Sequence, residues 1–585
     1  MPASTNPSAE YSRRLNERRT WLQKEEARSR NFWRWRRIVF VSGIILLLAT
    51  LAGWTPAWLL AIPVTTFIAL MAFHERVKRQ HELALRAVQF YERGLSRIED
   101  RWTGTGESGD RFVDKTHPYS EDLDLFGKGS LFELLSSART SGGEETLASW
   151  LLSAASVEII RKRQEAVKEL CPRIDLREDI ALLGDDVRAS VHTSELIAWG
   201  SAPRIHFSRF LRIVTPIVGI AALVSVILWL VLGMRWLGLG MILADLVVLF
   251  FVRDRISQII SRIELPSRDL RLLGEIVGRL EKEEFKSEYM SSLRFRLSKS
   301  PSHEISRLYR LIDILNSTRN VLFAPIAFVL LVPAQIAFAI EDWRIKWGSE
   351  LKVWIEVVSE FEALASFAAF SAEHPDDPFP AIISTGPVFE GEELAHPLLP
   401  RSRAVANDLK LTDAQPALVV SGSNMSGKST LLRTAGINAV LALAGGTVRA
   451  KKLRISPVTI GASIHILDSL QEGSSRFYAE ITRLRQIVDL TRGELPVFFL
   501  LDEILSGTNS HDRRVGAEKV VRGLIDRGAI GLLTTHDLAL TDIAENVHFE
   551  DHLEDGKLFF DYRMRPGVVK KSNALELMRA VGLDV

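Results

Sequence analysis

A glycine-rich stretch, GSNMSGKST at residues 422–430, has the residue types and spacing that bind phosphate groups. It fits the pattern G-x-x-x-x-G-K-[ST], follows the apolar run ALVV (417–420) and precedes an expected helix over 430–444. In such a loop, backbone N–H groups and the helix N-terminus hold the phosphates of a nucleotide such as ATP, and a bound Mg²⁺ accompanies them. We expect the lysine to reach the β and γ phosphates and the serine after it to bind Mg²⁺. The expected phosphate-binding residues are Gly422, Ser423, Asn424, Met425, Ser426, Gly427, Lys428, Ser429 and Thr430.

Two apolar runs downstream end in polar side chains that suit phosphate chemistry. PVFFLLDE (496–503) reads as a buried strand ending in Asp502 and Glu503. We expect Asp502 to hold Mg²⁺ through water, and Glu503 to orient or deprotonate the attacking water. A further strand, AIGLLTTH (529–536), ends at His536, which could contact the γ-phosphate or its water. A lone histidine at the end of a strand is more often structural. The position of His536 directly after this third strand nevertheless favours a role at the γ-phosphate.

The order of elements predicts an α/β nucleotide-binding domain of the P-loop type at the C-terminal end, preceded by an all-α core with transmembrane hairpins. Strands alternate with helices after PDDPFP (375–380), whereas 130–200 and 256–320 read as helices. The predicted domains are a basic cytoplasmic arm (1–37), a transmembrane hairpin (38–73), a helix and linker (74–109), the first part of the helical core (110–210), a second hairpin (211–253), the continued core or lever (254–375) and the ATPase domain (376–585).

Long apolar runs predict contact with a membrane. Residues 38–73 carry no charge over 36 positions and contain a WTP break, so they read as two short spans. Their flanks, RWRR and HERVKRQ, are both basic, which predicts that both ends face the cytoplasm. A second hairpin is expected at 213–252, with Asp245 facing its partner helices. A third run, 321–340, cannot span alone if the nucleotide loop faces cytoplasmic ATP, so we expect a buried core helix kinked near its two prolines, or a re-entrant segment.

Composition adds few constraints beyond these. The 585 residues carry a formal net charge of +1, so no global charge points to nucleic acid, but residues 1–37 hold ten Arg or Lys against four Glu. Anionic lipid and DNA phosphates both fit this arm, and lipid needs fewer assumptions. The single cysteine, Cys171, excludes an intrachain disulfide and is expected to be a packing residue rather than a nucleophile.

Several motifs together resemble the ATPase domain of the MutS family of DNA mismatch repair proteins. They are GSNMSGKST, SLQEGSSRFYAEI (469–481), FLLDEILSGTNSHD (499–512), TTHDL (534–538) and the C-terminal stretch 560–583. The pair Asn424 and Met425 is the most specific part of the resemblance. Residues 122–170 are similar to the start of the MutS helical core, and ELAHPLLP (393–400) is similar to the segment that leads into the ATPase domain.

The resemblance implies a homodimer in which each ATP site is completed by the other subunit. Ser475 would meet the γ-phosphate in trans, residues 507–512 would line the interface, and Asn407 would contact the nucleotide. DNA binding, to mismatched or branched DNA, is implied by the resemblance only.

Three departures from the family pattern stand out. A basic arm and apolar hairpin occupy the place of the mismatch-reading domain with its Phe-x-Glu wedge, and the DNA-clamping insertion of the core is not recognisable. The aromatic residue that usually precedes the phosphate loop and stacks on adenine is replaced by Ala404 or Val405. Arg476 stands where a threonine is common.

The sequence therefore predicts a multi-pass protein of the cell (inner) membrane with a cytoplasmic MutS-type ATPase domain, which binds and hydrolyses ATP as a dimer and contacts membrane lipid. One alternative is an ABC-type transport-associated ATPase, which the few short spans and the Asn-Met pair oppose. Another is a nucleotide-gated membrane scaffold without DNA binding, which uses nucleotide only to dimerise and which the presence of Glu503 opposes.

Overall fold

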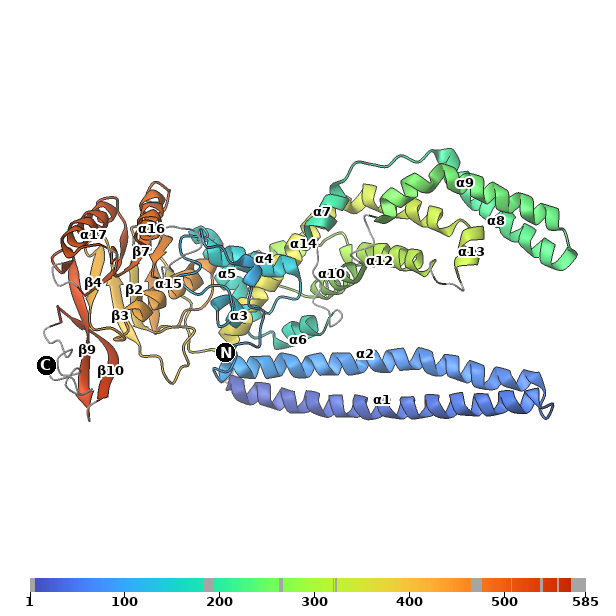
Figure 1. Cartoon of the computed structure of the whole chain (residues 1–585), viewed down its shortest axis with the longest axis horizontal. Coiled ribbons are helices and arrows are strands. Elements are labelled where there is room, and N and C mark those ends of the chain that lie inside the picture. Colours follow the sequence, from blue (N-terminus) through green and yellow to red (C-terminus); the bar gives the residue numbers. More distant parts are fainter. Residues whose placement is uncertain are drawn as a thin grey trace. The chain divides into compact units, whose positions relative to one another are not determined.

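The computed structural model of the chain describes residues 6–183, 193–261, 267–318, 320, 323–464, 476–506, 508–536, 540–554 and 557–569. It is a mixed α/β structure with a helix-rich N-terminal part, as the sequence predicts, and its C-terminal part contains two sheets (Figure 1). The chain divides into two compact units. Unit 1 comprises Met1–Ser137, Thr146–Glu178 and Ala363–Val585, and unit 2 comprises Ala138–Glu145 and Asp179–Glu362.

The larger sheet of unit 1 has six strands in the order β10-β9-β4-β8-β7-β6. Strands β4, β6, β7, β8 and β9 run parallel to their neighbours, and β10 pairs with β9 antiparallel. The strands are β4 (Ala417–Ser421), β6 (Thr459–Ser463), β7 (Val497–Asp502), β8 (Ile530–Thr535), β9 (Glu545–Glu554) and β10 (Lys557–Pro566). Three helices accompany this sheet: α15 (Lys428–Ala444), α16 (Arg476–Leu490) and α17 (Ser510–Ile525).

The central strands are buried on both faces, which explains why they read as continuous apolar runs rather than alternating ones. Val419, Phe499 and Leu533 lie in one core cluster with side chains of α16 and α17. The residues between them face the other way, where Leu500 lies so close to Gly436 of α15 that an added Cβ would be 2.7 Å from its Cδ1. This two-sided packing fixes the carboxyl ends of β4, β8 and β7 next to one another.

A smaller four-stranded sheet, in the order β1-β5-β2-β3, adjoins the nucleotide loop in the sequence. Its strands are β1 (Ala381–Ile382), β2 (Phe389–Leu394), β3 (Asn407–Leu411) and β5 (Lys452–Ile455). The ring of Phe389 stacks on Phe498 of β7 with centroids 5.0 Å apart, which joins the two sheets in one core.

Short helices from the middle of the chain lie wholly or partly in the same unit, with the first residues of α4 and the last residues of α6 in unit 2. They are η2 (Asp110–Phe112), α3 (Leu131–Leu135), α4 (Ser141–Leu152), α5 (Val157–Leu170) and α6 (Ile174–Leu182). Helix α5 begins at its N-cap Ser156, and its Arg163 lies over the Trp150 ring and donates to the carbonyl of Ala444 at the end of α15. Cys171 is partly buried, and burial raises the pKa of its thiol to about 11, as expected for a packing residue.

The N-terminal residues form two long helices, α1 (Pro7–Leu51) and α2 (Ala61–Ile98), joined by a turn with the short helix η1 (Ala57–Leu60) (Figure 1). The predicted arm and first apolar span are thus one continuous helix. A buried ion pair fixes the base of this helix pair: Arg97 donates from Nε (2.6 Å) to Glu373, and both side chains are at most 5% exposed. Tyr11 donates to the same carboxylate at 3.3 Å.

Unit 2 is helical in its described residues. It contains α7 (Thr193–Ser201), α8 (Arg209–Leu232), α9 (Arg235–Ser261), α10 (Ser267–Leu280), α11 (Glu288–Arg296), α12 (Pro301–Ser317), α13 (Ala324–Val329) and most of α14 (Val332–Glu373), whose last residues belong to unit 1. Helix α10 packs on α12, and α8 on α9 and α13. The apolar run 321–340 is not one kinked helix, because the backbone breaks between α13 and α14, where Leu331 has φ +49°.

Two helical segments of the described residues are long and apolar enough to cross a membrane, Ala57–Ile98 and Arg209–Leu232. The apolar end of α1 and helix α9 do not reach this criterion, so two of the four predicted spans meet it. Asp245 of α9 is fully buried, and neither carboxylate oxygen has a hydrogen-bond partner within the described ranges.

Candidate nucleotide-binding site

The loop between β4 and α15 is built around two glycines with positive φ. Gly422 has φ +150°, and a Cβ there would lie 2.8 Å from the Ser426 Oγ and 3.1 Å from the Phe549 carbonyl oxygen. Gly427 has φ +105° and forms the N-cap of α15. Met425, at the tip, also has φ +67° and its side chain is 83% exposed. The two glycines therefore let the chain turn back sharply, so that the first residue of α15 points at the loop.

That first residue, Lys428, is almost fully buried, and its ammonium group closes the loop. Nζ donates to the carbonyl oxygens of Gly422 (3.2 Å) and Ser423 (3.0 Å). Burial lowers the pKa of Lys428, and the nearby Glu503 carboxylate, 3.6 Å from Nζ, opposes this shift. The lysine is thus a positive charge held beneath the loop by fixed dipoles and one carboxylate.

The ends of β7 and β8 supply the acidic and imidazole groups. Asp502 is paired with Thr534 in the parallel register, and the Thr534 hydroxyl donates to the Asp502 carboxylate. The next residue, Glu503, has φ +46°, and its N–H donates to the same hydroxyl at 3.0 Å. This local twist turns the Glu503 side chain towards Lys428.

Glu503 and His536 form a short side-chain contact beside Lys428. The Glu503 Oε1 lies 2.6 Å from His536 Nε2, and the same nitrogen lies 3.2 Å from Lys428 Nζ. The hydrogen bond from His536 lowers the pKa of Glu503, an effect that burial partly opposes. The glutamate is therefore ionised at neutral pH and able to accept a proton. Three residues that the sequence analysis expected to act together are within 3.6 Å of one another.

A cavity of about 450 Å³ opens over the loop. Its lining includes Asn424, Met425, Gly427, Lys428, Ser429, Thr430, Asn407 and Glu503 of the predicted set. The hydroxyl oxygens of Ser423 and Ser426 are buried beside it and have no hydrogen-bond partner in the described part of the chain. Unpaired buried hydroxyls are costly unless a ligand or water bonds them, so the loop fits a phosphate group.

The residues expected to hold Mg²⁺ are Ser429 at the start of α15 and Asp502 at the end of β7. The described residues contain no cluster of three or more His, Cys, Asp or Glu side chains that could hold a metal alone. Mg²⁺ commonly takes only one or two protein ligands and completes its shell with phosphate oxygens and water. A hydroxyl and a carboxylate beside a phosphate loop fit that pattern.

An aromatic ring lines the cavity from a strand that the sequence analysis did not connect with the site. Tyr562 of β10 has φ +55° in a bulge of the β9–β10 pair, and its ring lies 3.1 Å from where a Cβ of Gly427 would be. Asn407 fixes this bulge: its amide donates to the Tyr562 carbonyl (3.0 Å), and its side-chain oxygen accepts from the Met564 N–H (2.7 Å). Asn407 lies at the cavity, as expected, but its side chain bonds β10.

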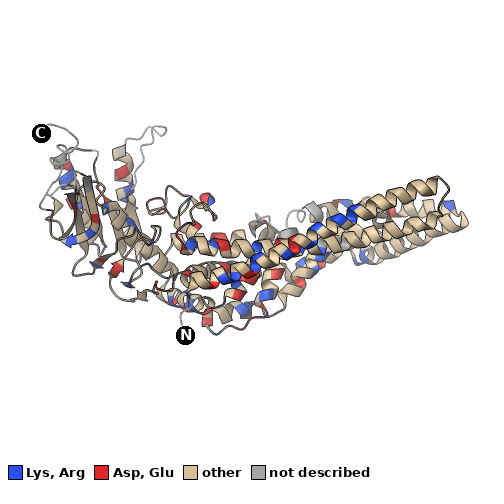
Figure 2. Ribbon diagram, turned by 90° about the horizontal axis from the view of Figure 1, so that it is seen from below, with Lys and Arg blue, Asp and Glu red and all other residues tan. Residues whose placement is uncertain are grey.

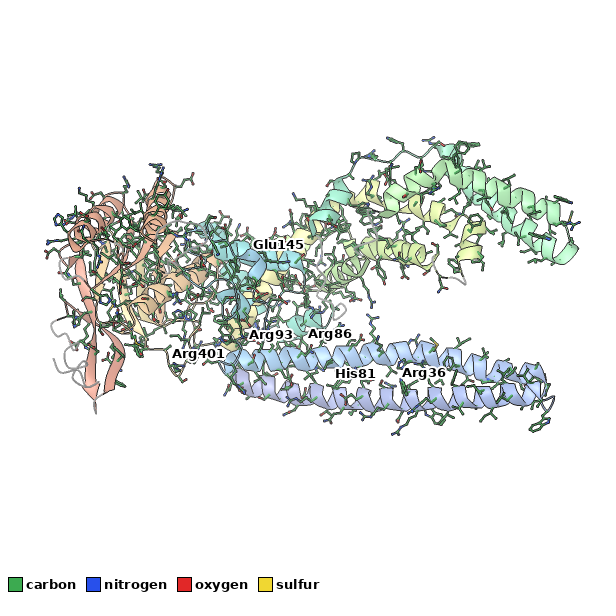
Figure 3. The ribbon with its side chains drawn as sticks, viewed as in Figure 1. Arg36, His81, Arg86, Arg93, Glu145 and Arg401 are labelled. Carbon is green, nitrogen blue, oxygen red and sulfur yellow. The ribbon has the colours of Figure 1, made fainter. Side chains whose placement is uncertain are left out.

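The cavity lining also includes Ala404 and Val405, the two positions that lack the aromatic residue expected from the resemblance. This wall is tied to the end of α2. The backbone N–H of Arg401 (labelled in Figure 3) donates to the Asp100 carboxylate at 2.7 Å. The Arg401 guanidinium donates to the Asp377 carboxylate at 2.6 Å.

Two predicted parts of the site lie outside the described residues. Ser475, expected to act in trans, falls in 465–475, and Gly507 of the expected interface is also not described. Asn509, two residues after Gly507, caps α17 by accepting from the Asp512 N–H at 2.9 Å. The structure therefore describes the edge of the sheet with Lys428, Glu503 and His536, but not Ser475, the residue expected to complete the site from a second subunit.

Comparison with known proteins finds a family and several relatives that are similar to this part of the chain. The family description MutS domain V matches residues 418–584, which contain the glycine loop, Glu503, His536 and Tyr562. This part of the chain is similar to domain V of the MutS family. The matched range also includes the Asn-Met pair of the loop and Asp502 at the end of β7.

Individual MutS relatives align over the same region. The chain is 32% identical over 241 residues to DNA mismatch repair protein MutS of Natronomonas pharaonis, covering 39% of this chain and 27% of that protein. It is 35% identical over 236 residues to DNA mismatch repair protein MutS 2 of Halobacterium salinarum (38% and 26%), and 32% identical over 196 residues to Endonuclease MutS2 of Thermus thermophilus (32% and 25%). The chain thus matches about a quarter of the length of these curated relatives.

Proposed function

We propose that the chain is a membrane-anchored ATPase of the MutS type, which binds MgATP in the cavity over the glycine loop and hydrolyses it. The observation that carries this proposal is the contact of Lys428, Glu503 and His536 at one edge of a parallel sheet, next to two unpaired buried hydroxyls. In phosphoryl transfer, catalysis comes mainly from positioning and from charge stabilisation, and this set of groups offers both.

Each residue has a distinct role in the proposal. The loop N–H groups and Lys428 bind the phosphates, and Ser429 and Asp502 hold Mg²⁺, which neutralises developing charge when bound. Glu503, ionised at neutral pH, takes the proton of the attacking water. His536 holds the Glu503 carboxylate in place through the 2.6 Å contact and is within reach of the same water.

Tyr562 supports the base side of the nucleotide. A ring that lies over Gly427 and lines the cavity offers a stacking surface for adenine, in place of the aromatic residue that positions 404 and 405 lack. Stacking of a base on an aromatic side chain contributes about 1–3 kcal/mol. Stacking does not distinguish one base from another by hydrogen bonds. We therefore expect only a modest preference for ATP over GTP.

A dimer completes the proposed site. Met425 at the loop tip is 83% exposed, which is unusual for a large apolar side chain and suits an interface. The predicted trans residue Ser475 and the stretch 507–512 would come from the ATPase domain of a second copy. DNA binding is proposed at the level of the family alone, since the named relatives are mismatch repair proteins and an endonuclease.

Membrane anchoring is supported by the exposed apolar ends of the long helices. Apolar side chains of α1 and α2 at the turn are largely exposed, including Leu51 at 77%, Trp54 at 83% and Ile68 at 61%. Helices α8 and α9 expose Leu230 (79%) and Phe250 (76%) in the same way. Such exposed large apolar side chains are unfavourable in water when they lie together, and they suit the hydrocarbon of a bilayer. We place the protein in the cell (inner) membrane, with its ATPase domain in the cytoplasm where ATP is present.

The test is ATP hydrolysis by the full chain purified in detergent or reconstituted in lipid. Lys428→Ala should lower phosphate release at least 100-fold, while the matched control Lys519→Ala, which removes an exposed lysine of α17, should leave it unchanged. Equal rates for parent and Lys428→Ala would refute the site. Nucleotide binding without any turnover in a single-turnover experiment would instead favour the scaffold alternative.

A further inference from the structure

The arginines of helix α1 near the core of unit 1 are paired with carboxylates. Arg14 Nη1 lies 2.5 Å from Asp175, and Arg18 Nε lies 2.6 Å from Glu178. The more exposed Arg13 and Arg19 are also paired, at 2.6–2.8 Å, with Glu10, Glu17 and Glu92. The charge of this end of the helix is thus balanced within the protein.

The arginines nearer the turn differ. Arg34, Arg36 and Arg37 of α1 and Arg76 of α2 have no carboxylate within salt-bridge distance among the residues described here. Three of them lie near aromatic rings instead: Arg36 is 5.7 Å from the centroid of Phe67, Arg37 is 4.7 Å from that of Trp33, and Arg76 is 5.7 Å from that of Phe73. Figure 3 labels Arg36 on the helix pair, farther towards the turn than His81. We call Arg34, Arg36, Arg37 and Arg76 the basic collar.

The basic collar borders the apolar ends of α1 and α2. The uncharged stretch 38–73 begins directly after Arg37 and ends three residues before Arg76. Figure 2 shows blue segments on the α1/α2 pair giving way to tan towards the turn. Trp33 and Trp35, within the collar, are 54% and 60% exposed, as is typical of tryptophans at the level of lipid headgroups.

We propose that the basic collar binds the phosphate groups of anionic phospholipids. This inference rests on the membrane anchoring proposed above and adds the lipid class. The guanidinium fork matches a phosphate in two hydrogen bonds, and each basic side chain near an anionic leaflet adds about fivefold to the affinity. Duplex DNA also offers phosphates, but it provides no apolar surface for the exposed Ile38 and Phe40, which follow the collar on the same helix.

The experiment compares two lipids on the full chain in detergent micelles. Brominated phosphatidylglycerol or brominated phosphatidylcholine is added, and the quenching of tryptophan fluorescence gives the relative binding constant of the two lipids. Arg34→Gln/Arg37→Gln should lower the preference for the anionic lipid about fivefold per arginine removed. Arg34→Lys/Arg37→Lys should keep most of it. The matched control, Arg13→Gln/Arg19→Gln, removes two exposed charges of the same helix and should leave the preference unchanged.

Each outcome decides something. Equal quenching by the two lipids in the parent protein overturns the collar and leaves the membrane anchor standing, whereas no quenching by either lipid overturns the anchor itself. If Arg13→Gln/Arg19→Gln lowers the preference for the anionic lipid as much as Arg34→Gln/Arg37→Gln does, the preference comes from net charge, and this result also overturns the collar. A labelled duplex is titrated in parallel, and loss of duplex binding in Arg34→Gln/Arg37→Gln with an intact lipid preference would assign these arginines to DNA. Thermal melting of each variant checks that it is folded.

Discussion

Replacing Glu503 by glutamine separates catalysis from nucleotide binding at the proposed site. The substitution keeps the shape of the side chain and its ability to contact His536, but glutamine cannot accept a proton from water. General-base catalysis contributes about 10²–10⁴-fold, or about 3–5 kcal/mol of the barrier. We therefore expect Glu503→Gln to lower kcat by a factor in this range.

The effect on ATP affinity should be much smaller. Two unit charges 4 Å apart attract by about 4 kcal/mol at an effective dielectric constant of 20, and Glu503 lies 3.6 Å from Lys428. However, the Glu503 side chain is 41% exposed, and water reduces exposed pairs to ~0–1 kcal/mol. Removing the Glu503 charge leaves Lys428 more available to phosphate. The affinity for ATP should therefore stay the same or increase by less than about tenfold.

The assay measures phosphate release under single-turnover conditions and titrates a fluorescent ATP analogue separately. Glu518→Gln is the control, because it removes a partly exposed carboxylate of α17 that pairs with Arg522. A kcat within threefold of the parent would refute the role of Glu503 as base. A parallel loss of affinity and rate would show that Glu503 builds the pocket instead.

Three further predictions follow from contacts described above. Tyr562→Ala should weaken nucleotide binding about 5- to 100-fold through lost stacking, and Tyr562→Phe should not, as measured by titration of the ATP analogue. Glu362 is fully buried, accepts from the Arg139 N–H (3.0 Å), and has its pKa raised to about 7 by burial. A carboxyl group whose pKa is raised by folding stabilises the fold at low pH. The contribution of Glu362 to the free energy of unfolding, about 3 kcal/mol, is therefore present below pH 4.5 and is lost as pH rises through 7. Urea titrations at several pH values should show that Glu362→Gln lacks this pH dependence. Arg97→Ala leaves Glu373 buried and unpaired, which should cost about 3–5 kcal/mol in the same titration, whereas Arg97→Met/Glu373→Leu should recover most of it.

The charged part of the site could be predicted from sequence because its pieces are local. The glycine loop is a contiguous motif, and Asp502, Glu503 and His536 directly follow apolar runs of strand length. Parallel strands bring such ends to one edge of a sheet, which the registers Asp502↔Thr534 and Ser421↔Thr535 illustrate. Local pattern and fold topology thus point to the same place.

The rest depends on pairing over long distances, which no local pattern encodes. Tyr562 reaches the cavity only because a bulge in β10 gives it a positive φ and because Asn407, 155 residues earlier, bonds that bulge. Likewise, hydropathy suggested a boundary at residue 37, whereas α1 continues through it. Helical hydrogen bonds are satisfied within the helix, so a change from polar to apolar side chains need not interrupt it.

The bond between Arg401 and Asp100 has a mechanical consequence. Asp100 stands just beyond the end of α2, a helix of 38 residues and therefore about 57 Å long. A rotation of α2 by only about 5° about that end would displace its other end by about 5 Å. A small movement of the pocket wall would therefore produce a larger displacement at the far end of the helix. Distance probes that report on nucleotide should consequently be attached near the turn at residues 52–60, where the largest displacement is expected, rather than beside the cavity.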